Sequence, residues 1–406
     1  MRRIPELDGL RGVSALTVAF SHATIWTLER TGHPMPPLTA FFRAAADLAV
    51  IVFFVLSGLV IGINEQALHS RGAVAGYALR RITRIYPIYV LGLVAGFSVV
   101  AAPLLSKEFL ADGGFLQMWL TPFPPGNAAL WSLHYEAVFY ALFPIVVFLN
   151  FKPLPLAITL ALVSMLMLFS SAHLLVICGY FSLWLLGLWL AQFSQSNSSD
   201  RPVIGPMALL LLAYFAANPV GAMLSKSAPP MTNAVGLPHP LSAVAIGFPV
   251  AALVAASFGL GRRYLWIATL MMFAVVGATL VGVVLRHLLW MPSYQAACAA
   301  VLAATLIAVT RWRIDLSART MVWFGDVSYA LYVFHTPVIL CALLLVPRKS
   351  PWPFYVIAVV VALPISILLA WIAEKLLQPR ISRWVRRTWP IARHARPVQP
   401  ATAELA

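Results

Sequence analysis

Long runs of apolar residues occupy almost the whole chain. Each run is about 17 to 25 residues long, which is the length that a helix needs to cross roughly 30 Å of hydrocarbon. Helices satisfy their own backbone groups, so lipid permits them. Of the 406 residues, 61% are apolar and only 10% are charged, too few for the polar coat of a water-soluble protein. The sequence therefore predicts an all-α, polytopic integral membrane helical bundle.

The apolar runs predict about 10–12 transmembrane helices. One membrane domain, residues 1–379, is followed by a basic cytoplasmic tail, residues 380–406, which we expect to be disordered at its end. The candidate spans are residues 12–28, 46–64, 86–104, 129–149, 154–170, 174–192, 204–220, 241–259, 264–285, 294–310, 322–346 and 353–373.

Lys and Arg residues set the expected orientation, because they are enriched in cytoplasmic segments. With the N-terminus inside, the inner segments hold most of the 28 basic residues. Both termini are therefore predicted to be cytoplasmic, and the segment 105–128 to lie outside. The net charge of +15 is spread over helix ends. This distribution indicates contact with membrane lipid and argues against a nucleic-acid partner.

Ionisable side chains within the spans are candidates for function, because hydrocarbon is a costly environment for them. Arg11 and His22 are eleven residues apart, which places them on one helical face with a rise of about 16 Å between them. Glu136 lies at a similar depth to His22 in the span 129–149, and we expect it to pair with His22 or Arg11. A His–Glu pair supplies an oriented base that can activate a hydroxyl. The alternative is a buried His22 that only bonds a neighbouring helix.

A second candidate group contains two arginines just before Pro87. Arg81 and Arg84 are three residues apart in what we expect to be an inner loop, and share a helical face. Guanidinium groups are suited to bidentate contacts with phosphate. The bias of basic residues toward the cytoplasm would also produce this pair, so both interpretations stay open.

The third group is a polar stripe in the span 322–346. Ser328, Tyr332 and His335 have spacings of four and three, which places them near one face of a helix, and Tyr329 widens the stripe. Such a stripe indicates a cavity or a tight seam between helices.

Glu374 lies close to a span end, where we expect a solvated or snorkelling side chain. The three cysteines lack metal-ligand spacing, so no metal site is expected.

Five stretches, taken in order, resemble the acyltransferase-3 family of bacterial membrane O-acyltransferases. They are residues 7–22, the Phe53–Gly58 stretch with Ser57, the Arg81 and Arg84 pair, Trp131-Ser132-Leu with Glu136, and Ser328-Tyr329 with Tyr332 and His335. The resemblance runs from Arg3 to about Pro379. It implies transfer of an acyl group, commonly acetyl from cytoplasmic acetyl-CoA, to hydroxyls of extracytoplasmic glycans or small glycosides, in the bacterial cytoplasmic (inner) membrane.

The resemblance also implies roles for individual residues. The functional positions of the family fall on Arg11, His22, Arg81, Arg84 and Glu136. We expect acyl-CoA to be a co-substrate, with no bound cofactor. The candidate catalytic residues are His22, Glu136 and His335, and the candidate residues for binding acyl-CoA and substrate are Arg11, Arg81, Arg84, Ser57, Trp131, Ser132, Ser328, Tyr329 and Tyr332.

Some alternatives stay open at the level of sequence. The acyl group could pass through a covalent intermediate on Ser57, Ser328 or Tyr329. Some family members carry an extracytoplasmic hydrolase-like domain that this sequence lacks, so the membrane part either completes the transfer or hands the acyl group to a periplasmic partner protein. The rival function is a proton-coupled transporter of a small solute, since such carriers also use intramembrane His and Glu. The absence of a second copy of the motifs argues against a transporter.

Overall fold

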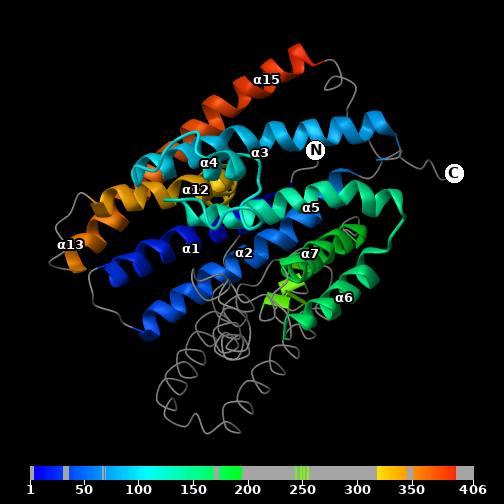
Figure 1. Cartoon of the computed structure of the whole chain (residues 1–406), viewed down its shortest axis with the longest axis horizontal. Coiled ribbons are helices and arrows are strands. Elements are labelled where there is room, and N and C mark those ends of the chain that lie inside the picture. The colour runs from blue at the N-terminus through cyan, green and yellow to red at the C-terminus, as the bar shows by residue number, and fades with distance from the viewer. Residues whose placement is uncertain are drawn as a thin grey trace, which may run out of the picture.

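The computed structural model describes residues 4–30, 36–65, 68, 70–168, 173–193, 318–344 and 351–389, with separate residues between 243 and 255. The predicted spans 204–220, 264–285 and 294–310, most of the span 241–259 and the end of the tail lie outside the described residues. Long helices packed side by side make up the described part, which confirms the predicted helical bundle (Figure 1).

The main helices of the described part follow the predicted spans, with different boundaries. They are α1 (Pro5–Arg30), α2 (Pro36–Asn64), α3 (Arg71–Val99), α5 (Trp131–Phe148), α6 (Pro153–Ser164), α7 (His173–Leu190), α12 (Arg319–Leu344), α13 (Pro351–Val356), α14 (Leu363–Trp371) and α15 (Gln378–Thr388), with the short α4 (Lys107–Gly113) between α3 and α5. Two π-helices, η5 (Ile357–Ala362) and η6 (Ile372–Leu377), flank α14.

Six helical stretches of the described part are long and apolar enough to cross a membrane. Helix α1 is not among them, although it is 26 residues long. Helix α6, on the predicted span 154–170, has 12 residues and is too short for a full crossing. Arg80 and Arg81 of α3 contact Glu65 just after the end of α2, and Arg84 contacts Glu374 of η6. We call this part of the bundle, where Arg80, Arg81 and Arg84 lie, the arginine end.

Glycines allow the closest helix crossings. A Cβ atom on Gly12 of α1 would lie 2.6 Å from the backbone nitrogen of Gly325 in α12, so the two backbones touch. Helices α2 and α7 cross in the same way at Gly58 and Gly187, where an added Cβ would meet a carbonyl oxygen at 1.9 Å. Membrane helices associate through such small residues because lipid provides no hydrophobic force between them.

Arg81 and Arg84 lie within helix α3 and not in the predicted inner loop, because the helix continues through Pro87. Proline has no N–H, so it leaves the carbonyl four residues earlier without its helical donor. For Pro87 this is the Thr83 carbonyl, which accepts a hydrogen bond of 2.7 Å from Nε2 of Gln378. A side chain from another helix therefore replaces the lost backbone bond, as a membrane interior requires.

The same replacement occurs at two further prolines inside helices. In each case a side chain distant in sequence donates to the carbonyl that the proline leaves open. The Tyr77 hydroxyl donates to the Tyr140 carbonyl, which Pro144 of α5 leaves open, and Asn127 Nδ2 donates to the Val333 carbonyl, which Pro337 of α12 leaves open.

The segment between α3 and α5 turns back along α3. Asn127 donates to the carbonyl of Gly92 at 3.1 Å, and the hydroxyl of Tyr89 donates to the carbonyl of Asp112. Gly92 precedes the end of α3 by seven residues, a rise of about 10 Å. Gly126 has a φ of +66°, and any Cβ there would overlap the backbone of α3. The predicted outer loop is therefore ordered and wedged between helices, while its side of the membrane stays a prediction.

Candidate functional site

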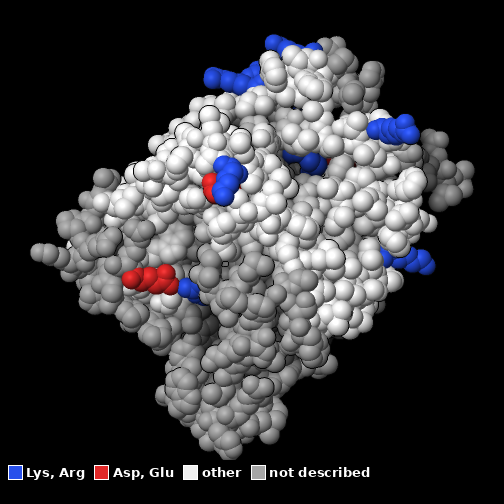
Figure 2. Space-filling model, in the orientation of Figure 1, with Lys and Arg blue, Asp and Glu red and all other residues white. Residues whose placement is uncertain are grey.

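A cavity of about 910 Å³ opens near the arginine end of the bundle. This volume lies in the range of ligand pockets, about 300–1,000 Å³. Its walls come from α1, α2, α3, α5, α12, η6 and α15, and Figure 2 shows basic side chains recessed in a hollow of the visible face. Nine residues singled out from the sequence line it: Arg11, Ser57, Arg81, Arg84, Ser132, Glu136, Ser328, Tyr329 and Tyr332.

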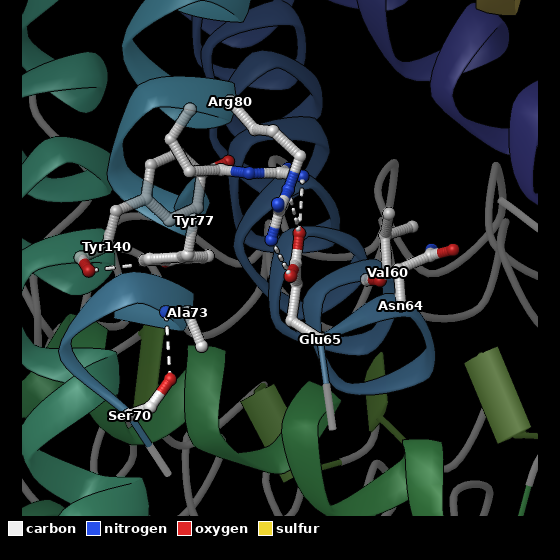
Figure 3. Close-up of polar contacts among 9 residues, drawn as sticks. Val60, Asn64, Glu65, Ser70, Ala73, Tyr77, Arg80 and Tyr140 are labelled. Carbon is white, nitrogen blue, oxygen red and sulfur yellow. Dashed lines mark hydrogen bonds and ion pairs between the residues drawn. The ribbon is translucent and has the colours of Figure 1, made fainter. Parts of the chain in front are cut away.

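Two of the cavity arginines share one carboxylate. Arg80 donates from Nε and Nη2 to both oxygens of Glu65, and Arg81 donates to the same group at 3.2 Å (Figure 3). Glu65 follows the end of α2 and is 7% exposed. A buried carboxylate that bonds two guanidinium groups holds both arginine side chains in place.

The third arginine of α3 has its own acidic partner. Arg84 donates to Oε2 of Glu374 at 2.7 Å, and its guanidinium carbon lies 5.5 Å from the ring centre of Tyr329. The prediction of a solvated Glu374 is wrong, because this side chain is 7% exposed and lies in the π-helix η6. A π-helix has a wider turn and often marks a functional site. Here it carries the carboxylate toward the cavity.

Some donor groups of the cavity have no partner within the described chain. Nε of Arg81 is buried and makes no hydrogen bond there. Arg11 lines the cavity and forms no hydrogen bond or ion pair with the described residues. Buried cationic donors without partners favour an anionic ligand, since such groups are costly to leave unsatisfied.

Glu136 lies in the middle of the cavity wall and is bound by hydroxyl groups. Ser57 donates to its Oε1 at 2.8 Å, and the hydroxyl of Tyr140 donates to the same oxygen. The indole Nε1 of Trp184 donates to Oγ of Ser57 at 3.2 Å. The expected pairing of Glu136 with His22 or Arg11 is therefore absent from the described contacts. Hydrogen bonds from the hydroxyls of Ser57 and Tyr140 stabilise this buried carboxylate instead.

Hydroxyl groups of α12 and α5 line the inner part of the cavity. Tyr332 donates to the Ala129 carbonyl at 2.9 Å, so Ser132, at 2.7 Å from Tyr332 Oη, donates to it in turn. Tyr329 donates to the Ile85 carbonyl at 2.8 Å. Three residues of the predicted stripe, Ser328, Tyr329 and Tyr332, therefore line the cavity, and their hydroxyls are fixed by backbone groups, whereas His335 does not line it.

His22 and His335 form a pair just beyond Tyr332. Nδ1 of His22 lies 2.8 Å from Nε2 of His335, and the His335 ring centre is 5.7 Å from that of Tyr332. Nδ1 of His335 lies 3.2 Å from the carbonyl oxygen of Leu331. A carbonyl only accepts, so Nδ1 of His335 carries the proton and its Nε2 accepts from Nδ1–H of His22. Nε2 of neutral His22 is then left with a free lone pair.

Trp131, a candidate residue for binding acyl-CoA and substrate, lies in the apolar interior. It is 8% exposed, and it makes T-shaped, edge-to-face ring contacts with Phe54 and Tyr135. The reason is the wedged segment before α5, which makes the helix begin inside the bundle. Trp131 does not line the cavity and is part of the apolar core.

Sequence reasoning missed Glu65, Arg80 and Glu374 as parts of the site. The chain has 13 acidic residues against 28 basic ones, so each acidic residue close to the arginine end was a candidate partner. That signal is weak, because the pairing joins α3 to segments far away in the sequence. For Arg84 and Glu374 the separation is 290 residues.

Comparisons with known proteins identify a family for this chain. Residues 4–371 match the family described as "Acyltransferase domain", the acyltransferase-3 family. The protein named "Putative acetyltransferase ORF330" of Acidianus two-tailed virus is 32% identical over 146 residues. That match spans 35% of this chain and 40% of the viral protein. No solved structure matches the chain.

Proposed function

This chain belongs to the acyltransferase-3 family, and on that premise we propose that it is a membrane-bound O-acyltransferase. The donor is a cytoplasmic acyl-CoA, with acetyl as the first acyl group to test. The acceptor is a hydroxyl of an extracytoplasmic glycan or small glycoside, with a periplasmic acyl-accepting protein as another possible acceptor. The protein lies in a bacterial cytoplasmic membrane with its arginine end inside.

The observation that carries this proposal is the order of groups along the cavity. Arg81 lies 6.0 Å from the ring centre of Tyr140, whose hydroxyl donates to Glu136. The His22 and His335 pair does not line the cavity but lies against Tyr332, which does. This order suits a donor with phosphates at one end and a thioester at the other. Arg11 and Nε of Arg81 offer unpartnered donors for phosphate oxygens.

The chemistry occurs next to Tyr332, where the His22 and His335 pair lies against the cavity wall. Nε2 of His22 takes the proton of the acceptor hydroxyl while its oxygen attacks the thioester carbonyl carbon. The carbon–sulfur bond breaks, the ester forms, and the CoA thiolate leaves and receives the proton. His335 acts as the positioning residue, because its bond to the Leu331 carbonyl fixes which nitrogen of His22 is free.

Glu136 has a different role from the one expected from the sequence. Its carboxylate is held by Ser57 and Tyr140 in the cavity wall, between the arginines and Tyr332. A carboxylate there accepts hydrogen bonds from the amide N–H groups of a pantetheine arm. It therefore aligns the donor rather than orienting His22.

The test is single-turnover transfer from radiolabelled acetyl-CoA by the full chain in reconstituted membranes. Acceptors are surface glycans of defined classes, supplied on the side opposite the donor. Labelled ester on a glycan supports the proposal, and His22→Ala should abolish it. Movement of a solute without any ester formation would overturn the proposal in favour of a carrier.

A further inference from the structure

Helix α15 follows directly on the membrane helix α14 and its π-helix, and it has an unusual composition. Its 11 residues include Arg380, Arg383, Arg386 and Arg387 and no acidic residue. Two tryptophans are exposed, Trp384 within the helix by 62% and Trp389 just after it by 54%. Figure 1 shows α15 leaving the bundle at an angle, and Figure 2 shows basic side chains gathered over it.

One face of α15 belongs to the cavity. Gln378, Ser382, Val385 and Arg386 line it, and the spacings of four and three residues place the first three on one side of the helix. Gln378 also fixes the start of the helix to α3 through the Thr83 carbonyl. The position of α15 therefore sets the position of one cavity wall.

The opposite face presents arginines. Arg380, Arg383 and Arg387 have spacings of three and four residues, and at 100° per residue they lie about 180° from the cavity face. All three are exposed. Just before the helix, Leu376 is 42% exposed, so an apolar surface suited to hydrocarbon reaches almost to its first residue.

We propose that α15 is a surface helix whose outer face binds anionic lipid headgroups at the arginine end of the bundle. The exposed leucine of η6 places its start at the edge of the hydrocarbon. Tryptophan side chains favour the headgroup layer, and arginines bind the phosphates there. The headgroup layer thus accounts for the tryptophans, and the negative charge of an anionic leaflet accounts for the arginines.

The same helix couples the lipid to the cavity. With its outer face held by headgroups, the inner face stays against α3, where Arg84 is paired with Glu374. Loss of the lipid contacts lets α15 shift and opens the wall. This step rests on the proposed function, because it assumes that the cavity binds acyl-CoA.

The test of the surface does not depend on activity. A spin label on Trp384→Cys, with Cys178, Cys298 and Cys341 replaced by Ser, reports depth through its access to oxygen and to a water-soluble nickel chelate. The full chain is placed in vesicles of phosphatidylcholine alone or with an equal part of phosphatidylglycerol. We expect the label at headgroup depth, and deeper in the anionic vesicles.

Substitutions identify the arginines responsible. Arg380→Gln, Arg383→Gln and Arg387→Gln together should move the label toward water in anionic vesicles, and Lys at the same positions should restore it. The matched control is Lys152→Gln, an exposed basic residue of another inner segment. A label in water with both lipids overturns the proposal, and so does an equal shift produced by inorganic phosphate without anionic lipid.

The coupling has its own measurement. In anionic vesicles the triple Gln variant should bind CoA several-fold more weakly, while Lys152→Gln leaves the dissociation constant unchanged. Equal CoA affinity with a displaced label would overturn the coupling alone and leave the lipid surface in place. Failure of the wild-type chain to bind CoA would instead count against the proposed function.

Discussion

His22 and His335 share a hydrogen bond of 2.8 Å although 313 residues separate them in the chain. The bond joins α1 to α12, and these helices approach closely because Gly12 and Gly325 allow their backbones to touch. The proposed base is thus assembled by a helix crossing. The bond between His335 and a backbone carbonyl of α12, rather than a carboxylate, determines which nitrogen of His22 can accept a proton.

His22 and His335 should therefore act as one unit. His22→Ala should abolish transfer, because the base is lost. His335→Ala should lower the single-turnover rate by about a hundredfold, within the range for positioned proton transfer. The double variant should be scarcely slower than His22→Ala, since groups acting together are non-additive. His173→Ala is the control. Additive losses of rate in the double variant would contradict the joint action of His22 and His335.

Substitutions of Arg84 and of its partner Glu374 should change the affinity for acyl-CoA in opposite directions. Arg84→Ala should weaken acyl-CoA binding by about tenfold, roughly 1.4 kcal/mol, through the loss of a charged phosphate contact. Arg84→Lys should be intermediate, because the ammonium keeps the charge but loses the planar fork. Glu374→Gln should tighten binding, since the carboxylate competes with phosphate for Arg84. Binding titrations with CoA measure all three, and unchanged affinity in Arg84→Ala would make the arginine a topology signal only.

The sequence predicted the class of fold and nine of the residues that line the cavity, from local patterns and the family motifs. Apolar runs of membrane length predicted the helices, and the spacing of Ser328, Tyr329 and Tyr332 predicted a polar face. Partners could not be predicted in the same way. Glu136 was expected near His22 from depth alone, but depth does not say which helices are neighbours.

The prediction of helix boundaries was wrong for a related physical reason. Arg81 and Arg84 were expected in an inner loop before the span 86–104, but the helix runs through Pro87, because another side chain supplies the donor that proline lacks. Gln378 does so from a distance of 295 residues in the chain. Only the tertiary structure brings that donor to the Thr83 carbonyl, so no local pattern could have shown it.

The Gln378 bond predicts a specific pattern of stability. Gln378→Met should lower the stability of the chain by about 1–2 kcal/mol, because the Thr83 carbonyl is left unsatisfied. In a Pro87→Ala background the N–H of residue 87 can take its place, so the same substitution should cost much less. A double-mutant cycle of thermal unfolding in detergent measures the difference. An equal cost in both backgrounds would contradict the replacement of the backbone bond.

The predicted orientation can be tested with two exposed lysines. Lys107 of α4 has a side chain that is 90% exposed, and Lys152 precedes α6 at the other end of α5. In a background without cysteine, a membrane-impermeant thiol reagent added from outside the cell should label Lys107→Cys and miss Lys152→Cys. The reverse pattern would place the arginine end outside and move the acyl-CoA entry side with it.

Asp112 of α4 predicts how stability depends on pH. Burial raises the pKa of its carboxyl group to about 6, and the hydrogen bond from Thr121 only partly opposes this. Its Oδ2 is buried without a partner among the described residues. Because the folded pKa exceeds the ordinary value of 3.8, the folded chain binds the proton more tightly than the unfolded chain. The stabilisation is complete below the ordinary pKa and is lost as the pH rises through about 6.

Asp112→Asn should remove this dependence, because an amide does not titrate and its N–H₂ fits the position of the unpartnered oxygen. At neutral pH this variant should be more stable than the wild-type chain by about 1 kcal/mol, a value reduced for screening by solvent. Thermal unfolding of the purified chain from pH 4 to pH 8 measures the slope. Glu108→Gln, on the same short helix, is the comparison. The pKa of Glu108 is lowered in the folded chain, so its own contribution is constant above the ordinary value of 4.5, and the loss of stability near pH 6 should remain, slightly reduced because Glu108 helps to raise the pKa of Asp112. If Asp112→Asn loses stability over the same pH interval as the wild type, another buried group is responsible for it.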